Sequence, residues 1–515
     1  MRTKYSIKNS VMSFVNTIVN FVFLFIAQKL FIKILGIEYN GLNGLFTNIL
    51  TFLNLFELGI GSAINYHLYK YIKVNDIKTI KSIMTFYKKA YRIISIMIFM
   101  IGLLFIPFLR YIVKDITVNI NIIIVYLLFL LTTISTYIIS YKRNLLFAYQ
   151  KNYFINIINI LYIIVLNISQ IFVIYFTKNY YLYLIIKIVC IIIENIIINI
   201  KVNKDYPYMK EKNNYNIDAE LKSDIFNKVR ALMIHKISSS VTNGTDNILI
   251  SIFIGIKTVG LYTNYNYIIS SIKKLFQNFV YATMPSIGNL LVENDCEKNY
   301  LIFKKISFIN FWITTFTSVC LFMLIRPFIS IWIGDKYLLS EFVSIILVTN
   351  YYQDMMRNSY NIFKDAAGIW VDDKYIPVLQ ILINLFCSII LLKIIGLAGV
   401  FLGTIISRLV LWFYSYPKYV YKKLFNKTYA DYYKELLLNM LVTIIIMLST
   451  YFISNIFIIS SSTIQLFING LICLIVPNLT MYLLYRKNAE FKYYMKLIKK
   501  IINKKTIQNN YKSIN

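Results

Sequence analysis

The chain has 515 residues, a mean hydropathy of +0.62 and only 15% charged residues. Soluble globular domains carry roughly 25% charged residues and disordered chains carry few large apolar ones, so this composition excludes both classes. The 54 Lys and Arg residues outnumber the 23 Asp and Glu residues, which gives a formal charge of +31. Such an excess favours either a polyanionic partner or a membrane protein whose basic residues set its orientation.

Apolar runs recur along the whole sequence, each close to the roughly 20 residues that cross the hydrocarbon core of a bilayer. We expect about fourteen transmembrane helices of this kind, because lipid offers an open backbone no hydrogen-bond partners. In chain order they are residues 11–34, 42–64, 91–110, 118–140, 153–176, 180–200, 231–254, 260–284, 306–328, 341–362, 375–394, 397–417, 435–456 and 463–485.

The basic residues are distributed unevenly between the connections. When the N-terminus is placed inside, most Lys and Arg residues lie in the inside connections and in the tail of residues 486–515. The positive-inside rule therefore predicts that both termini are cytoplasmic, and the basic tail suits anionic lipid headgroups without any nucleic acid. The first apolar run is longer than the core of a signal peptide, so we interpret it as the first membrane helix.

The Cys and His residues and the lack of a phosphate-binding loop disfavour a metal site, a redox site and an ATP-binding site. The 5 Cys residues show neither metal-ligand spacing nor a disulfide framework, and the chain has only 2 His residues. No Gly-rich phosphate loop occurs in the sequence. We therefore expect no cofactor, no metal site and no ATP-driven pump, and the short outside connections leave no room for an extracytoplasmic domain.

A weak internal repeat relates the first third of the chain to the middle at a constant offset of 219 residues. The matched positions include Gly36 with Gly255 and Gly41 with Gly260. The offset superposes the first two expected helices on the seventh and eighth in the same orientation. Parallel halves related by an axis along the membrane normal are a transporter architecture, with the substrate path between the halves.

Several expected helices carry polar residues on one face, which is typical of helices that line a cavity. These stripes include Asn20 in the first helix, Asn54 and Glu57 in the second, His235 and Asp246 in the seventh, and Asn266 and Gln277 in the eighth. The alternative is that the same residues form hydrogen bonds between packed helices.

Charged residues inside the expected spans indicate a functional site more strongly, since placing each at the centre of a membrane helix costs on the order of 2.5–3.5 kcal/mol. They are Lys273 with Lys274, Arg357 with Asp354 one turn away, Arg408, and the pair Lys187 and Glu194 on one face. Alternatively, these charges have no role in function and form buried ion pairs that only hold helices together. The candidate pairs are Asp354 with Arg357 and Asp246 with Lys273.

Mid-membrane cations favour an anionic substrate, because Arg grips phosphate oxygens in pairs. Amide and hydroxyl side chains suit a polyhydroxylated substrate. An oligosaccharide joined through pyrophosphate to a lipid carrier has both properties, although a nucleotide sugar or another organic anion would also fit.

Four blocks of sequence resemble Wzx-type polysaccharide repeat-unit flippases. They are residues 35–69, which begin LGIEYNGLNGLF, residues 244–265 (GTDNILISIFIGIKTVGLYTNY), residues 326–339 (RPFISIWIGDKYLL), and residues 372–409, which end GLAGVFLGTIISRL. These flippases belong to the multidrug/oligosaccharidyl-lipid/polysaccharide exporter superfamily, together with lipid II flippases and multidrug antiporters.

The resemblance implies an all-α polytopic membrane protein with two bundles of about six helices in a V-shaped, MATE-like arrangement, plus an additional C-terminal helix pair. The domains would be an N-terminal bundle at 1–200, a cytoplasmic linker at 201–230, a C-terminal bundle at 231–421, the additional helices at 422–485 and a basic cytoplasmic tail at 486–515.

The resemblance also implies a function, that of moving undecaprenyl-pyrophosphate-linked sugar units across the bacterial cytoplasmic membrane for capsule or O-antigen synthesis, driven by an ion gradient. A polysaccharide polymerase and chain-length machinery would be partners, besides membrane lipids. The expected contacts to diphosphate or sugar are Lys273, Lys274, Arg357, Arg408, Asn20, Asn54, Asn266 and Gln277, and the expected coupling or gating carboxylates are Glu57 and Asp246.

Two other classes stay open. A multidrug antiporter shares the architecture but needs an acidic and aromatic cavity for cations, which the basic mid-span residues disfavour. A membrane polymerase or ligase would need a substantial outside loop with catalytic residues, so we do not expect an enzyme.

Overall fold

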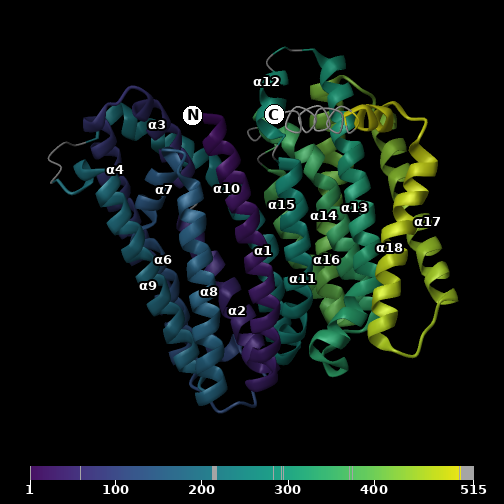
Figure 1. Cartoon of the computed structure of the whole chain (residues 1–515), viewed down its shortest axis with the longest axis horizontal. Helices are drawn as coiled ribbons and strands as arrows, with labels where there is room; N and C mark the ends of the chain where they lie inside the picture. The colour runs from purple at the N-terminus through teal and green to yellow at the C-terminus, as the bar shows by residue number, and fades with distance from the viewer. Residues whose placement is uncertain are drawn as a thin grey trace, which may run out of the picture. The chain divides into compact units, whose positions relative to one another are not determined.

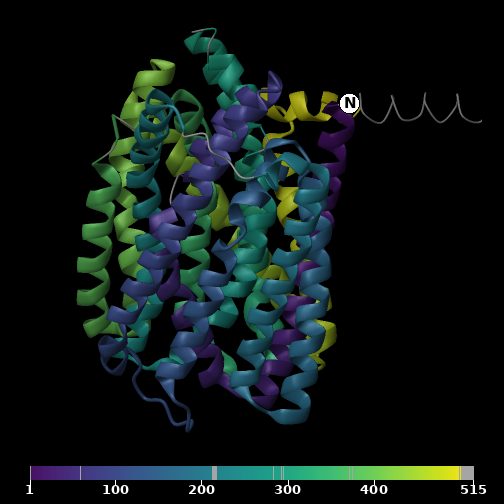
Figure 2. The ribbon, with the colours of Figure 1, turned by 90° about the vertical axis from the view of Figure 1, so that its left-hand side faces the viewer.

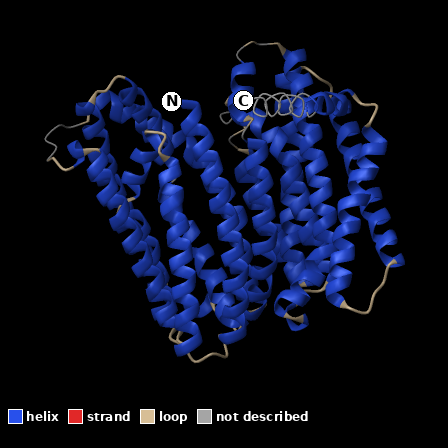
Figure 3. Cartoon of the chain, viewed as in Figure 1, coloured by secondary structure: helices blue, strands red, loops and turns tan. Residues whose placement is uncertain are grey.

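The computed structural model describes residues 2–57, 60–211, 217–281, 283–291, 293, 295–369, 372–373, 375–497 and 499. In these residues every regular element is a helix and no strand occurs (Figure 3). The prediction of an all-α polytopic fold is thereby confirmed.

Ten helical segments of the described chain are long and apolar enough to cross a membrane. The expected spans outside this set are 42–64, 231–254, 260–284 and 341–362, and their described residues are largely helical. The span 42–64 is outside this set because helix α2 (Ile37–Leu53) has only 17 residues. The other three carry two of the polar stripes and the Asp354–Arg357 pair. Three of the four expected spans with a polar stripe are outside this set, whereas the first span, which carries the stripe with Asn20, belongs to it.

The chain divides into two compact units, which are described separately. Unit 1 comprises residues 1–264 and 377–400, and unit 2 comprises residues 265–376 and 401–515. The domain boundaries predicted from the sequence stay a prediction.

Unit 1 holds the helices of the first half of the chain (Figure 1). They are α1 (Arg2–Ile34), α2 (Ile37–Leu53), η1 (Asn54–Glu57), α3 (Ile60–Lys73), α4 (Ile77–Leu104), η2 (Ile106–Phe108), α5 (Leu109–Ile112), α6 (Ile122–Tyr137), α7 (Ser140–Ala148), α8 (Asn152–Thr177), α9 (Tyr180–Asp205), η3 (Pro207–Met209), α10 (Ala219–Phe253), the start of α11 (Ile256–Tyr281) and nearly all of α15 (Ile376–Ile395). Helix α8 packs between α1 and α9, and the three lie side by side in both views (Figures 1 and 2).

Unit 2 holds the remaining helices, including the C-terminal pair. They are the rest of α11, α12 (Met284–Leu291), α13 (Cys296–Ile333), η4 (Asp335–Tyr337), α14 (Glu341–Ala367), most of α16 (Leu397–Val410), the π-helix η5 (Leu411–Leu424), α17 (Tyr429–Ile456) and α18 (Ser462–Tyr485). Helix α13 contacts α14, α17 and α18, so the C-terminal pair packs directly on the bundle. The core of unit 2 is rich in buried aromatic rings, among them Tyr360, Tyr416, Tyr421 and Tyr432.

Short polar side chains begin several helices at the positions where the backbone N–H groups have no helical partner. Asp76 accepts the N–H of Thr79 at 3.0 Å at the start of α4. Thr428 and Asp431 form a reciprocal capping box at the start of α17. Each cap marks a helix boundary that the local sequence specifies.

The internal repeat has a structural counterpart within unit 1. Helices α2 and α11 each begin directly after a glycine with positive φ, +106° at Gly36 and +123° at Gly255, which are matched positions of the repeat. A Cβ on Gly41 would overlap the carbonyl oxygen of Ile256, and a Cβ on Gly260 would overlap that of Ile37. The two contacts are reciprocal under the same offset, so the repeat preserves a close helix crossing that only glycine permits.

Candidate functional site

Four charged side chains from three helices meet in unit 2. Lys273 of α11 forms an ion pair with Asp354 of α14. The other oxygen of Asp354 lies 3.4 Å from Nη1 of Arg357 and 3.9 Å from Nη2 of Arg408, which belongs to α16. One carboxylate therefore faces three cations, and this group is called the cationic cluster below.

Hydrogen bonds hold both guanidinium groups of the cationic cluster in place. Nε of Arg357 donates to the hydroxyl of Tyr416 at 2.9 Å, and this hydroxyl donates to Oδ1 of Asn361 at 3.0 Å. Nη1 of Arg408 donates to the carbonyl oxygen of Asn350 at 2.9 Å and to its Oδ1 at 3.1 Å. The guanidinium groups are thus oriented before any ligand arrives.

Helical geometry explains how the sequence builds this arrangement. Asn350, Asp354, Arg357 and Asn361 are spaced by three or four residues on α14, so their side chains share one face. Tyr416 reaches that face from the π-helix η5, which continues α16 beyond Arg408. π-helical turns are uncommon and often occur at functional sites.

The cationic cluster is only partly shielded. The exposed fractions of its side chains are 29% for Lys273, 18% for Arg357 and 7% for Arg408, against 17% for Asp354. An anion could reach Lys273 and Arg357 directly, whereas Arg408 acts from deeper in the helix packing.

The other predicted site residues of unit 2 lie on α11 with Lys273. Gln277 donates to Oδ1 of Asn358 at 3.3 Å, Lys274 is exposed, and Asn266 is partly buried. The geometry therefore brings Lys273, Arg357 and Arg408 together, with Gln277 bonded to the same helix α14.

A second polar cluster lies in unit 1, where the second expected span is broken. Helix α2 ends at Leu53 and the short 3₁₀ turn η1 ends at Glu57. The Glu57 carboxylate accepts a hydrogen bond from the Tyr91 hydroxyl, which itself accepts one from Tyr87 at 3.1 Å. Asn144 donates to Tyr87, and this chain from Asn144 to Glu57 is called the tyrosine relay below.

The remaining predicted residues of unit 1 differ in environment. Asn54 accepts a hydrogen bond from Tyr137 at 2.9 Å beside the tyrosine relay. Asp246 is buried on α10, and Asn20 is exposed on α1. The side chain of His235 lies outside the described residues.

One ion pair considered from the sequence is not the one in the structure, and the two charges noted on one face of the sixth expected span have separate partners. The partner of Lys273 is Asp354 rather than Asp246, because α14 presents its carboxylate to α11 within unit 2. Glu194 pairs with Arg143 at 2.8 Å rather than with Lys187. Lys187 instead lies over the ring of Phe129, with its Nζ 5.9 Å from the ring centre.

Sequence reasoning missed the tyrosines that complete both clusters. Tyr91 of α4 and Tyr137 of α6 bond to the broken helix, Tyr87 bonds to Tyr91, and Tyr416 of η5 bonds to Arg357. The four-residue spacing of Tyr87 and Tyr91 on one helix face was the available signal. This spacing is not distinctive in a sequence that has 44 tyrosines.

Among the described residues no group of His, Cys, Asp and Glu side chains is arranged to hold a metal ion. The two clusters offer fixed cations, amides, hydroxyls and two carboxylates, Asp354 in the cationic cluster and Glu57 in the tyrosine relay.

Comparison with known proteins identifies the fold. No family model matches the sequence, and no curated protein matches it. The structure is similar to the lipid II flippase MurJ in an inward closed conformation, with a TM-score of 0.65 and 16% identity over 93% of this chain and 99% of that chain.

Two further solved structures have the same fold. One is a MOP superfamily transporter from Pyrococcus furiosus described as having a binding pocket of reverse polarity, with a TM-score of 0.56 and 14% identity over 79% of this chain and 92% of that chain. The other is the MATE transporter VcmN of Vibrio cholerae, with a TM-score of 0.53 and 13% identity over 79% of this chain and 94% of that chain. The chain therefore has the multi-pass fold that this flippase and these transporters share.

Proposed function

We propose that this protein is a flippase that moves undecaprenyl-pyrophosphate-linked oligosaccharide units from the inner to the outer leaflet of the bacterial cytoplasmic membrane. The observation that carries the proposal is the cationic cluster, in which Asp354 balances only part of the charge of Lys273, Arg357 and Arg408. The pyrophosphate of the carrier supplies the missing negative charge.

The cluster suits a diphosphate in its chemistry as well as its charge. Charge-assisted hydrogen bonds from guanidinium to phosphate are among the strongest that side chains form, and they strengthen where water is scarce. Within the cluster, Asp354 is the carboxylate that faces all three cations. A diphosphate that approaches the partly exposed Lys273 competes with Asp354 for the three cations. Its attraction to the cations offsets part of the free energy that is lost when the diphosphate and the cations are desolvated.

The tyrosine relay supports a coupling role for Glu57. Discontinuous helices are where transporters commonly hold substrates and coupling ions. Glu57 lies at the break between α2 and α3 and accepts the hydrogen bond of Tyr91. We assign Glu57, together with the buried Asp246, to ion-gradient coupling or gating.

The comparisons support a lipid-linked cargo. MurJ is a lipid II flippase, so the same fold accommodates a substrate on a lipid carrier. The Pyrococcus furiosus transporter is described as having a binding pocket of reverse polarity that suggests a different function, so the polarity of the pocket varies within this fold. Cytoplasmic termini, a role in capsule or O-antigen synthesis and a polysaccharide polymerase as partner belong to the same proposal.

Transport of a fluorescent undecaprenyl-pyrophosphate oligosaccharide in proteoliposomes tests the proposal. We expect Arg408→Ala and Lys273→Ala each to reduce the rate at least about tenfold, the effect of losing roughly 1.4 kcal/mol of binding. Lys273→Arg should retain part of the activity because the charge remains. Lys336→Ala, in the loop element η4, is the matched control and should transport at the wild-type rate.

Full activity of both alanine variants would refute the role of the cationic cluster. Transport of organic cations without transport of the oligosaccharide would instead identify the protein as a multidrug antiporter.

A further inference from the structure

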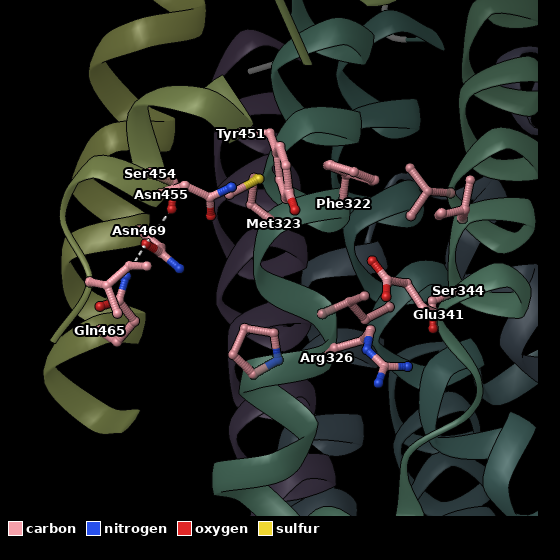
Figure 4. Close-up of a pocket in the computed structure, with 15 residues that line it drawn as sticks. Phe322, Met323, Arg326, Glu341, Ser344, Tyr451, Ser454, Asn455, Gln465 and Asn469 are labelled. Carbon is pink, nitrogen blue, oxygen red and sulfur yellow. Dashed lines mark hydrogen bonds between the residues drawn. The ribbon is translucent and has the colours of Figure 1, made fainter. Parts of the chain in front are cut away.

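A pocket of about 360 Å³ lies in unit 2 among α13, α14, α17 and α18 (Figure 4). It occupies the ends of these helices that adjoin the connections 334–340 and 457–461. None of its lining residues belongs to the cationic cluster, so it is a separate feature.

The lining of the pocket is amphipathic. Its polar part comprises Arg326, Glu341, Ser344, Ser454, Asn455, Gln465 and Asn469. The apolar side chains Ile345, Tyr451 and Ile458 line the pocket too, and they are exposed, Ile458 to 76%. Exposed apolar surface on a transmembrane bundle faces lipid, so a ligand here would have a polar group inside and an apolar part outside.

The two charged residues of the lining are opposite in sign and are not paired with each other. Both border the same pocket (Figure 4), and among the described residues no ion pair joins them. Arg326 donates to the carbonyl oxygen of Leu339, which anchors one end of its guanidinium group. Glu341 stands in the first turn of α14, where the helix dipole stabilises a carboxylate. Arg326 is anchored and Glu341 is exposed. Two separated charges of opposite sign match a ligand that carries both a phosphate and an ammonium group.

The amides opposite the charged residues are oriented by their own hydrogen bonds. Oδ1 of Asn469 accepts bonds from Ser454 at 2.7 Å and from Gln465 at 2.8 Å. Oε1 of Gln465 accepts the backbone N–H of Ile459 at 2.7 Å. Since its oxygen is engaged, Asn469 offers its N–H groups, and Figure 4 shows its nitrogen pointing away from Ser454. These donors suit the phosphate and ester oxygens of a lipid.

We propose that this pocket binds the headgroup of a phospholipid with a phosphoethanolamine group, with its acyl chains along the exposed face of α14 and α17. Arg326 contacts the phosphate, Glu341 contacts the ammonium group, and Asn469 donates to the ester oxygens. The lipid sits between the bundle and the C-terminal pair and stabilises their contact. The site is independent of the transported substrate.

Lipid binding by the purified full-length protein tests the proposal. Native mass spectrometry would follow exchange in nanodiscs that contain equal amounts of phosphatidylethanolamine and phosphatidylglycerol. We expect the wild-type protein to retain phosphatidylethanolamine at least about tenfold over phosphatidylglycerol. Glu341→Gln should abolish this preference while some lipid remains bound, and Arg326→Gln should release both lipids.

Glu220→Gln is the matched control, since Glu220 is an exposed carboxylate in the first turn of α10, in unit 1. It should leave lipid selectivity unchanged. Arg326→Lys keeps the charge and should retain lipid if Arg326→Gln does not fold. Equal retention of the two lipids by the wild type, a preference for phosphatidylglycerol, or a preference that Glu341→Gln leaves intact would each overturn the proposal.

Discussion

Replacement of Asp354 by Asn is the most direct perturbation of the cationic cluster, because the change keeps the shape of the side chain and removes only its charge. Asp354 contacts Lys273, lies 3.4 Å from Arg357 and lies 3.9 Å from Arg408. At an effective dielectric constant near 20, each such pair attracts by about 4 kcal/mol before desolvation. Desolvation offsets most of this sum, and removing one partner of a buried pair typically destabilises by about 3–5 kcal/mol.

We therefore expect Asp354→Asn to lower the free energy of unfolding by about 3–5 kcal/mol, measured by thermal or denaturant unfolding in nanodiscs. The double variant with Lys273→Gln should lose less than the sum of the two single variants, since the repulsion is relieved. Inorganic pyrophosphate should stabilise Asp354→Asn more than the wild type, because it no longer competes with the carboxylate.

Asp372→Asn is the matched control, as Asp372 pairs with Lys423 at 2.6 Å but both side chains are well exposed. An exposed pair contributes about 0–1 kcal/mol, so this variant should unfold almost as the wild type does. If Asp354→Asn were as stable as Asp372→Asn, or if the losses of the single variants were simply additive, the cationic cluster would not be held by Asp354.

Three further expectations follow from the rest of the chain. Glu57→Gln should slow gradient-driven transport in proteoliposomes while leaving transport without a gradient unchanged; equal rates with a gradient would exclude a coupling role. Gly260→Ala should destabilise by roughly 1–3 kcal/mol or more, because its Cβ has no room at the helix crossing, whereas Gly470→Ala, which has open space, should not. Burial raises the pKa of Glu38, but hydrogen bonds from the side chain and backbone of Thr117 outweigh it and hold the pKa below its usual value. A lowered pKa means that Glu38 stabilises the fold above its unfolded pKa and that this contribution disappears as the pH falls through the folded value. Glu38→Gln should therefore flatten the acid side of the stability profile, and an unchanged profile would contradict this.

Much of the fold could be predicted from the sequence because it depends on short-range rules. Run length and hydropathy predict membrane helices wherever the chain is continuously apolar, as in α8 and α9. The repeat at Gly36 and Gly255 predicts equivalent starts for α2 and α11, and both helices begin one residue later.

The break in the second expected span could not be predicted in this way. Residues 42–64 form an apolar run with a polar stripe, which hydropathy alone interprets as one helix. The structure interrupts it at η1, where Asn54 and Glu57 bind tyrosines from α6 and α4. The interruption coincides with hydrogen bonds to other helices, which the sequence of residues 42–64 does not reveal.

The sequence by itself determined that this is a membrane protein and that Asp354 and Arg357 share one face of a helix. Helical periodicity and the thickness of a bilayer are sufficient for that much. Only the tertiary structure decided the partners: Asp354 with Lys273 and Arg408, and Glu194 with Arg143 rather than Lys187. Periodicity fixes the direction of a side chain around its own helix, whereas the rotation, depth and neighbour of each helix depend on how all the helices pack.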